Sequence, residues 1–216
     1  MSSPAAGLFY DPRVVSRPAP LTHNPLLALV APRPIAWIST MDRTGRLNLA
    51  PFSHFNIVSV DPPMVMFAPN SKDEAGAPKD TLRNVGEVPE FVVNVVSWEQ
   101  REQMNATSKI LPFGESEFAL AGVEPKSSVS VRPPRVADSK AALECRVWRV
   151  VELPSGRSKR NCHIVIGEVV GIHISPDIIV DGRICAQRLA QISRLGYFDY
   201  LVVQETFEMR RPDGPE

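Results

Sequence analysis

Short runs of alternating hydrophobic and polar residues dominate the chain from residue 34 onward. Residues 34–40, 55–60, 64–68 and 90–96 have the two-residue period, or the dense β-branched and aromatic composition, of strands. Two longer runs at 140–153 and 161–174 predict the longest strands, joined by an exposed loop at 154–161. Segments 79–88, 97–108 and 115–123 predict short helices. Because strands and helices do not alternate, we expect a mainly β protein, an antiparallel barrel with helical inserts.

The first 24 residues do not share this pattern. They are rich in Pro, Ser and Ala and show no periodicity. We therefore predict an arm at residues 1–24 that packs on the surface or reaches a partner, followed by a single domain at residues 25–216.

Charge and cysteine usage narrow the class of protein. The 216 residues include 24 Lys and Arg and 24 Asp and Glu, so the formal net charge is zero and nothing attracts nucleic acid or an anionic membrane. No run approaches the roughly 20 apolar residues of a membrane helix. Three widely spaced cysteines, which we interpret as buried small hydrophobic residues, indicate a reducing compartment. We predict a cytoplasmic protein without a membrane or nucleic-acid partner.

Several kinds of catalytic site leave no trace in the sequence. The motifs GxGxxG, GxxxxGK[ST] and GxSxG are missing, so a Rossmann fingerprint, a P-loop and a hydrolase nucleophile elbow are unsupported. The four histidines are scattered, and Cys162 and His163 point to opposite faces of one strand, so we predict no metal site. No pair of catalytic side chains is visible.

Two segments carry candidate binding chemistry. In "NLAPFS", Pro51 is expected to break a strand and free backbone groups that a flat heterocycle could satisfy, although a plain barrel corner explains the proline as well. In "KDTLRN", Lys79 begins a short helix whose N–H groups favour an anion such as phosphate, although an ordinary capped helix has the same pattern. Together, beside Trp37, the segments predict a ligand with a flat ring and a phosphate.

The order of these segments identifies a family resemblance. "RPIAWIST", "GRLNLAPFSHFN", "DPPMVMFAP", "KDTLRN", "EFVVNVV", "QMNATS" and the later "ALECRVWRVVEL", "IVIGEVVGIHI" and "SRLGYFDY" resemble the flavin reductase-like family of FMN-binding split barrels, over about residues 32–209. The resemblance implies an antiparallel split β-barrel, a homodimer with FMN near the subunit interface, and reduction by NADH or NADPH.

The resemblance also implies a set of cofactor-binding residues. They lie on the strand that lines the flavin, along the isoalloxazine edge, at a strand end beneath the ring, in the phosphate loop, and in a late loop that approaches the flavin, from this or the partner subunit. In that order they are Trp37, Ser39 and Thr40; Asn48, Ala50, Pro51, Phe52 and Ser53; Ala68 and Pro69; Lys79, Asp80 and Thr81; and Arg194, Leu195 and Gly196.

Three residues have open roles. Relatives often carry two glycines after "RL", whereas Tyr197 replaces the second here and could narrow access to the flavin. His54 could be an acid near the flavin, but a histidine between two phenylalanines is more often a packed, hydrogen-bonded residue. Trp37 could be a ligand contact or part of the core.

We therefore expect an FMN-dependent NAD(P)H oxidoreductase of the flavin reductase type, in which flavin N5 carries the hydride and no side chain is catalytic. The electrons would pass to oxygen, to a partner oxygenase or to another acceptor. The alternatives are a non-catalytic FMN-binding electron carrier or storage protein, which Tyr197 would favour, and a barrel that has lost flavin and acts as an interaction module.

Overall fold

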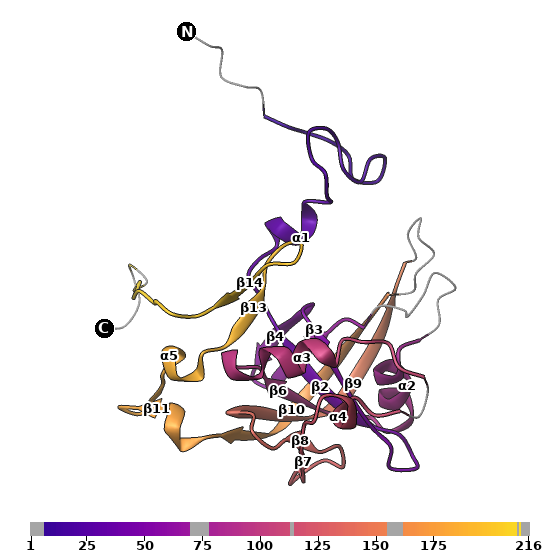
Figure 1. Ribbon diagram of the computed structural model, residues 1–216, viewed down its shortest axis with the longest axis vertical. Helices are drawn as coiled ribbons and strands as arrows, with labels where there is room; N and C mark the ends of the chain where they lie inside the picture. The colour runs from indigo at the N-terminus through magenta and orange to yellow at the C-terminus, as the bar shows by residue number, and fades with distance from the viewer. Residues whose placement is uncertain (1–6, 70–77, 113–114, 155–161, 211, 213–216) are drawn as a thin grey trace.

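The computed structural model describes residues 7–69, 78–112, 115–154, 162–210 and 212 (Figure 1). A seven-stranded antiparallel sheet forms its centre, in the spatial order β3-β2-β6-β9-β10-β5-β4. Its strands are β2 (Ala36–Met41), β3 (Leu47–Phe52), β4 (Phe55–Val60), β5 (Pro63–Phe67), β6 (Glu90–Val95), β9 (Ala141–Leu153) and β10 (Cys162–Ile174). The mainly β, antiparallel character predicted from the sequence is confirmed.

The smaller elements surround this sheet. A second sheet has the order β1-β13-β14, and two further pairs are β7-β8 and β11-β12. These strands are β1 (Arg33–Pro34), β7 (Pro125–Lys126), β8 (Arg135–Val136), β11 (Ile179–Val180), β12 (Arg183–Ile184), β13 (Ile192–Arg194) and β14 (Tyr200–Val202). The helices are α1 (Leu26–Leu29), α2 (Asp80–Glu87), η1 (Trp98–Gln100), α3 (Arg101–Ala106), α4 (Glu117–Leu120), η2 (Pro176–Ile178) and α5 (Ala186–Leu189).

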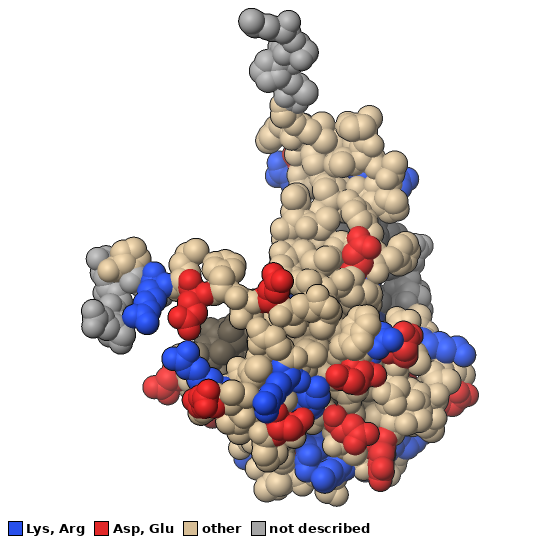
Figure 2. Space-filling view, turned by 60° about the vertical axis from the view of Figure 1, so that its left-hand side comes forward, with Lys and Arg blue, Asp and Glu red and all other residues tan. Residues whose placement is uncertain are grey.

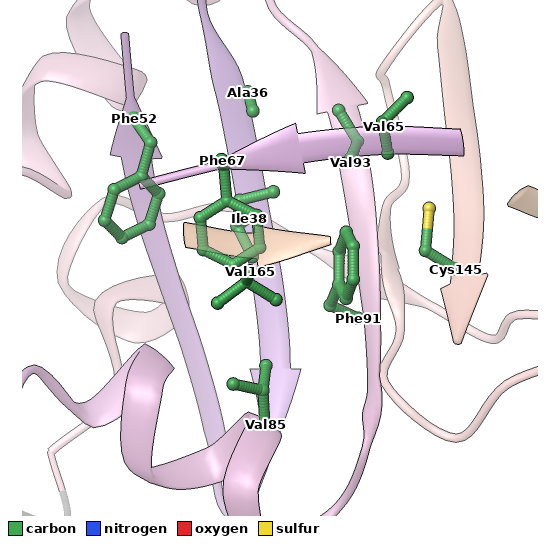
Figure 3. Close-up of a cluster of buried hydrophobic side chains, with 10 residues drawn as sticks. All are labelled: Ala36, Ile38, Phe52, Val65, Phe67, Val85, Phe91, Val93, Cys145 and Val165. Carbon is green, nitrogen blue, oxygen red and sulfur yellow. The ribbon is translucent and has the colours of Figure 1, made fainter. Parts of the chain in front are cut away.

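The main sheet curls around an apolar interior. Phe52 of β3 and Phe67 of β5 lie far apart in the strand order, yet their ring centroids are 5.2 Å apart. Phe91 of β6 stacks edge-on against Phe67 at the same centroid distance, and Val85 of α2 closes the cluster (Figure 3). The two ends of the sheet therefore face each other across one core, which is a barrel geometry.

Strand β2 is buried on both faces, which explains its unbroken apolar character. Ile38 points into the barrel core, while Trp37 belongs to a second core formed with α3 and α4. Met104 of α3 and Phe118 of α4 contribute to that second core. A central strand covered on both sides needs no polar face, unlike a half-exposed strand.

The expected strand break at Pro51 is wrong. Strand β3 runs through Pro51, which lies opposite Trp37 of β2, and the bend follows at Ser53 and His54. Since β3 is the edge strand of the sheet, the missing N–H of Pro51 costs no ladder hydrogen bond on the outer side.

A strap of chain, residues 128–136, crosses the sheet and is held by buried polar groups. Ser39 donates a hydrogen bond to the carbonyl of Pro134, and the Asn94 carboxamide oxygen accepts one from the Val136 N–H at 2.8 Å. The fully buried Glu144 carboxylate accepts hydrogen bonds from the backbone N–H groups of Val129 and Ser130, in the first turn of the strap. The strap thus satisfies polar side chains that the sheet would otherwise bury alone.

The N-terminal and C-terminal segments extend away from this body (Figure 1). Residues 7–24 contain no helix or strand and lead into α1. The Arg33 guanidinium donates to the carbonyls of Leu27 and Val30 and, at 2.7 Å, to that of Leu195. This side chain therefore ties α1 to the β13-β14 hairpin. Most of the predicted exposed loop, residues 155–161, lies outside the described residues.

Candidate functional site

A small cleft forms where β3 meets the start of α2. Its lining combines two segments singled out in the sequence with the turn after α3 and with Glu117 of α4. The lining residues are Asn48, Ala50, Pro51, Lys79, Asp80, Thr81, Thr107, Ser108, Lys109, Ile110, Leu111 and Glu117, around a cavity of about 70 Å³. The structure therefore brings together most of the predicted flavin-edge segment and all of the predicted phosphate loop.

The N-terminus of α2 opens into this cleft. Lys79 is the N-cap residue, and its side chain makes no capping hydrogen bond. The first N–H groups of a helix have no intrahelical acceptor, and the helix dipole adds positive potential there. The Lys79 ammonium lies 5.3 Å from the centroid of the Phe52 ring. These features suit a bound anion.

Buried hydrogen bonds fix the helix on the sheet beside the cleft. Asn48 of β3 donates to the Thr81 hydroxyl at 3.0 Å, and Asn84 of α2 donates to the Thr40 hydroxyl at 3.1 Å. All four side chains are buried. Asn48 and Thr81 thus lie at the cleft, whereas Thr40 lies behind it and docks the helix.

Two carboxylates balance the two lysines of the cleft. Asp80 forms an ion pair with Arg83 at 3.4 Å. The buried Glu117 accepts a hydrogen bond from the Leu49 N–H at 3.0 Å. Glu117 and Lys109 come from segments to which the sequence analysis assigned no function. The nearest signal was "QMNATS", which resembled the family without an assigned function and ends at Ser108, next to Lys109.

The side chains of Trp37 and Ser39 lie in the interior rather than at the cleft. Trp37 has no exposed surface, and its indole N–H donates to the Thr107 hydroxyl at 2.8 Å. Thr107 in turn donates to the Met104 carbonyl at 2.7 Å, so Trp37 anchors the segment that lines one wall of the cleft. Trp37 therefore supports the wall of the cleft from the protein interior and does not line the cleft itself.

The bend after β3 collects the remaining early residues. Phe52 faces the barrel core, Ser53 is half-buried, and the Ala68 N–H donates to the His54 carbonyl at 2.9 Å. Pro69, next along the chain, is buried. Burial lowers the pKa of His54, and the positive charge of Arg33 lowers it further. Both effects favour the neutral form of the imidazole.

Arg194, Leu195 and Gly196 lie elsewhere in the same chain. They occupy the β13-β14 hairpin beside α1, well separated from α2 in Figure 1. An added side chain at Gly196 would place its Cβ 2.5 Å from the Cβ of Ala28, so only glycine allows this close contact. One chain alone does not bring this loop to the cleft.

Tyr197 stands at the position where relatives often have a glycine. Tyr197 has a φ of 57°, the left-handed conformation that glycine adopts without cost, which explains why glycine suits this position. Tyr197 is 43% exposed, and the centroid of its ring lies 5.1 Å from that of the His23 ring in the N-terminal segment. The side chain therefore holds the arm against the hairpin.

Within the described residues, no three His, Cys, Asp or Glu side chains gather closely enough to hold a metal ion. In the same part of the chain, no helix has both the length and the apolar character needed to cross a membrane. Of the cysteines, Cys145 is buried as expected, but Cys162 and Cys185 are partly exposed.

Comparison with known proteins gives consistent results. A family model described as "Flavin reductase like domain" matches residues 28–187. Uncharacterized protein BH2278 of Halalkalibacterium halodurans is 37% identical over 187 residues, which cover 87% of this chain and 89% of that protein.

Two solved structures are similar in both sequence and fold. Nitrilotriacetate monooxygenase component B from Bacillus cereus is 36% identical, with a TM-score of 0.80 over 85% of this chain and 90% of that chain. The 2-nitrobenzoate 2-nitroreductase NbaA of Pseudomonas fluorescens is 27% identical, with a TM-score of 0.76 over 87% of this chain and 89% of that one. A split barrel domain from Shewanella frigidimarina, 22% identical with a TM-score of 0.74 over 86% of this chain and 89% of that chain, has the same fold and confirms the predicted split barrel.

Proposed function

Since the chain belongs to the flavin reductase-like family, we propose that it is an FMN-binding oxidoreductase that transfers hydride from NADH or NADPH to the flavin. The observation that carries this proposal is the meeting of Asn48–Pro51 with Lys79–Thr81 at one cleft. The first segment supplies small side chains and backbone at a sheet edge, and the second supplies a helix N-terminus with a lysine. This combination suits a ligand with a flat polar ring and a phosphate.

The residues of the cleft fit the phosphate end of FMN. Lys79 and the first turn of α2 would bind the phosphate, while Asn48 and Thr81, already hydrogen-bonded to each other, would hold the helix in place. Glu117 would repel a phosphate beside it. We therefore expect it to accept hydrogen bonds from hydroxyl groups of the ligand, or to keep its hydrogen bond from the Leu49 N–H. When bound, FMN supplies the hydride acceptor, and the protein excludes water and orients the ring.

The size of the cleft supports a homodimer. Ligand pockets usually enclose roughly 300–1,000 Å³, whereas this cleft encloses about 70 Å³. One chain therefore surrounds only part of a molecule as large as FMN. We propose that the Arg194–Gly196 loop of the partner subunit completes the site.

The apolar surface of the N-terminal segment supports the same proposal. Few charges lie on the part of the molecule that projects in Figure 2, compared with the body below it. Its exposed large hydrophobic residues are Leu8, Phe9, Val14, Val15, Leu26, Leu27, Leu29 and Val30. Such a surface is typical of an interaction site, and we expect it to be buried against a second copy of the chain.

The electron acceptor is proposed from the neighbours. The Bacillus cereus structure at 36% identity is by name a monooxygenase component, so we propose a partner oxygenase as the acceptor. Tyr197 favours a second candidate, an FMN carrier or storage protein that accepts hydride slowly, because a 43% exposed tyrosine replaces the expected glycine in the proposed flavin-facing loop.

The test is the visible spectrum of the purified protein with FMN, recorded anaerobically before and after NADH, then NADPH. Bleaching of the flavin bands within seconds supports the reductase and names its donor. Bands that persist support the carrier, and then the Tyr197→Gly variant should restore rapid bleaching. A protein that binds no FMN would overturn both candidates.

Substitution of Lys79 tests whether FMN binds at the cleft. We expect Lys79→Ala to weaken FMN binding by about 1.5–3 kcal/mol, or about 10- to 150-fold in Kd, the usual contribution of a charge-assisted hydrogen bond. The matched control is Lys126→Ala, an exposed lysine on β7 outside the cleft. Equal Kd values for both variants in a fluorescence titration would remove Lys79 from the site.

A further inference from the structure

A second and larger cavity is lined in part by α3, the helix that precedes the turn at the cleft. It encloses about 470 Å³ and belongs to the η1-α3 segment and the β13-β14 hairpin. Its lining is Trp98, Arg101, Glu102, Met104, Asn105, Ile192, Arg194, Phe198, Tyr200, Leu201 and Val202. It shares no lining residue with the cleft at Lys79. The volume lies within the usual range of small-molecule sites, roughly 300–1,000 Å³.

Two stacks of a guanidinium on an aromatic ring face this cavity from different elements. The Arg101 guanidinium carbon lies 3.9 Å from the Trp98 ring centroid, and that of Arg194 lies 4.6 Å from the Tyr200 ring centroid. Trp98 is 48% exposed and Tyr200 is 40% exposed. Large aromatic side chains that stay half-exposed beside cations provide flat faces and positive charge in one place.

The wall that carries Trp98 is held in place by the backbone. The Trp98 N–H donates to the Ala190 carbonyl at 2.9 Å, and Ser97 bridges to Gln191. Arg101 donates back to the Trp98 carbonyl at 2.9 Å, which holds its guanidinium near the indole. The site is therefore preorganised, which lowers the cost of ordering it around a ligand.

The remaining lining sets the chemistry of the ligand. Met104 and Ile192 are buried and provide an apolar floor. Arg101 and Arg194 are the lining cations, and Glu102 is the lining anion, at 3.4 Å from Arg101 and mostly exposed. The formal charge of the lining is thus +1, so an anionic ligand gains more from this site than a cationic one.

We propose that this cavity is a second ligand site, which binds a planar aromatic ring that carries an anionic group. The ring lies against the face of Trp98 or Tyr200 that its arginine leaves open, and the anion pairs with Arg101 and Arg194. Both guanidinium groups also donate within the chain, Arg101 to the Trp98 carbonyl and Arg194 to the Tyr197 carbonyl and the Tyr200 hydroxyl. A guanidinium suits this role because it stacks on rings and binds carboxylate or phosphate with two parallel hydrogen bonds.

Two kinds of molecule have this chemistry. One is a nucleotide half of the dinucleotide hydride donor, and the other is a small aromatic carboxylate that accepts electrons. The proposed function also places the Arg194–Gly196 loop at the flavin of the partner subunit, so Arg194 would lie between the two sites. Assigning either molecule as the reaction partner of the flavin rests on that proposed function.

Calorimetric titration of the full-length protein with two probes, AMP and benzoate, tests the site, and uncharged benzamide measures the contribution of the ring alone. We expect one of the anions to bind and the Arg101→Gln variant to weaken it about tenfold, as the loss of one charge-assisted contact predicts. The matched control is Arg149→Gln, since Arg149 stacks on Trp148 at 4.6 Å outside the cavity.

Each outcome has one meaning. Binding of AMP that depends on Arg101 identifies a nucleotide site, and the same result for benzoate identifies an aromatic acid site. If neither probe binds, or if Arg101→Gln and Arg149→Gln behave alike, the proposal is overturned. FMN titration of the same preparations separates this failure from failure of the proposed function, and the Lys79→Ala variant should leave the probe affinity unchanged.

Discussion

The buried carboxylate of Glu144 provides the sharpest test of how the strap is held on the sheet. Glu144 is fully buried, and its two oxygens accept the Val129 N–H at 2.8 Å, the Ser130 N–H, and a hydrogen bond from the His173 ring. In Glu144→Gln, one of these oxygens becomes an NH2 group that faces a donor. The variant keeps the size of the side chain and removes only its charge and one acceptor.

The magnitude follows from these contacts. One N–H left without an acceptor costs about 1–3 kcal/mol, and each of the other two bonds weakens by about 1 kcal/mol when the acceptor loses its charge. The sum is about 3–5 kcal/mol, close to the cost of breaking a buried ion pair. Since a domain is stable by about 5–15 kcal/mol, this loss is easily measured.

The effect should depend on pH. Burial raises the pKa of Glu144, but the hydrogen bonds from His173, Val129 and Ser130 outweigh burial, so its pKa lies below the ordinary value. A carboxyl group whose pKa is lower in the folded state contributes stability above its unfolded pKa, about 4.3, and loses that contribution as the pH falls. The difference between Glu144→Gln and the unmodified chain should therefore be full at pH 7 and shrink below about pH 4.

Urea unfolding followed by circular dichroism measures the difference, with Glu124→Gln, an exposed carboxylate, as the control. We expect the control to change the free energy of unfolding by less than about 0.5 kcal/mol. A Glu144→Gln variant that matches the control at pH 7, or a difference that grows toward low pH, would refute the reasoning.

Two further predictions concern tight packing and a turn. Gly167→Ala should lower the free energy of unfolding by about 1–3 kcal/mol, because the added Cβ would lie 2.5 Å from the Phe91 ring. Gly86→Ala in α2 has open space around the added Cβ, so it should raise the free energy of unfolding by about 0.5–1 kcal/mol. Chemical denaturation compares the two variants, and equal effects would contradict the packing argument. Asp42→Asn should lower the Tm at pH 7, since Asp42 accepts four hydrogen bonds in its turn, including one from the Arg46 guanidinium at 2.6 Å. Burial raises the pKa of Asp42, but these bonds hold it well below its usual range, so the Tm difference should fade as the pH drops below about 4; a difference independent of pH would contradict this.

Much of the fold could be predicted from local patterns. Short-range patterns predict the long strands β9 and β10, the helix α2, and the ends of β4 and β5 on either side of Asp61 and Pro62. Such elements depend on residues that are close in the sequence. The small sheet β1-β13-β14 could not be predicted in this way. Its strands have two or three residues, and β1 and β13 pair although residues 35–191 separate them in the sequence. Arg33 and the close contact at Gly196 hold the two ends together.

The error at Pro51 has a simple physical cause. Proline breaks a strand only where a neighbour needs its N–H, and the sequence does not show which strand is at the edge of the sheet. The position of β3 in the sheet therefore decided the outcome, not the residues around the proline. The same edge leaves Pro51 and Ala50 free to line the cleft.

The cleft shows why a site can be predicted better by segment than by side chain. The resemblance pointed to the segment with Lys79 and to the edge strand with Asn48, and the structure brings both to one cleft. It also pointed to the strand of Trp37, whose side chain turns away and reaches the cleft only through its hydrogen bond to Thr107. A strand beside a site contributes to it from one face alone, and which face that is depends on the layers packed above and below, which only the folded structure shows.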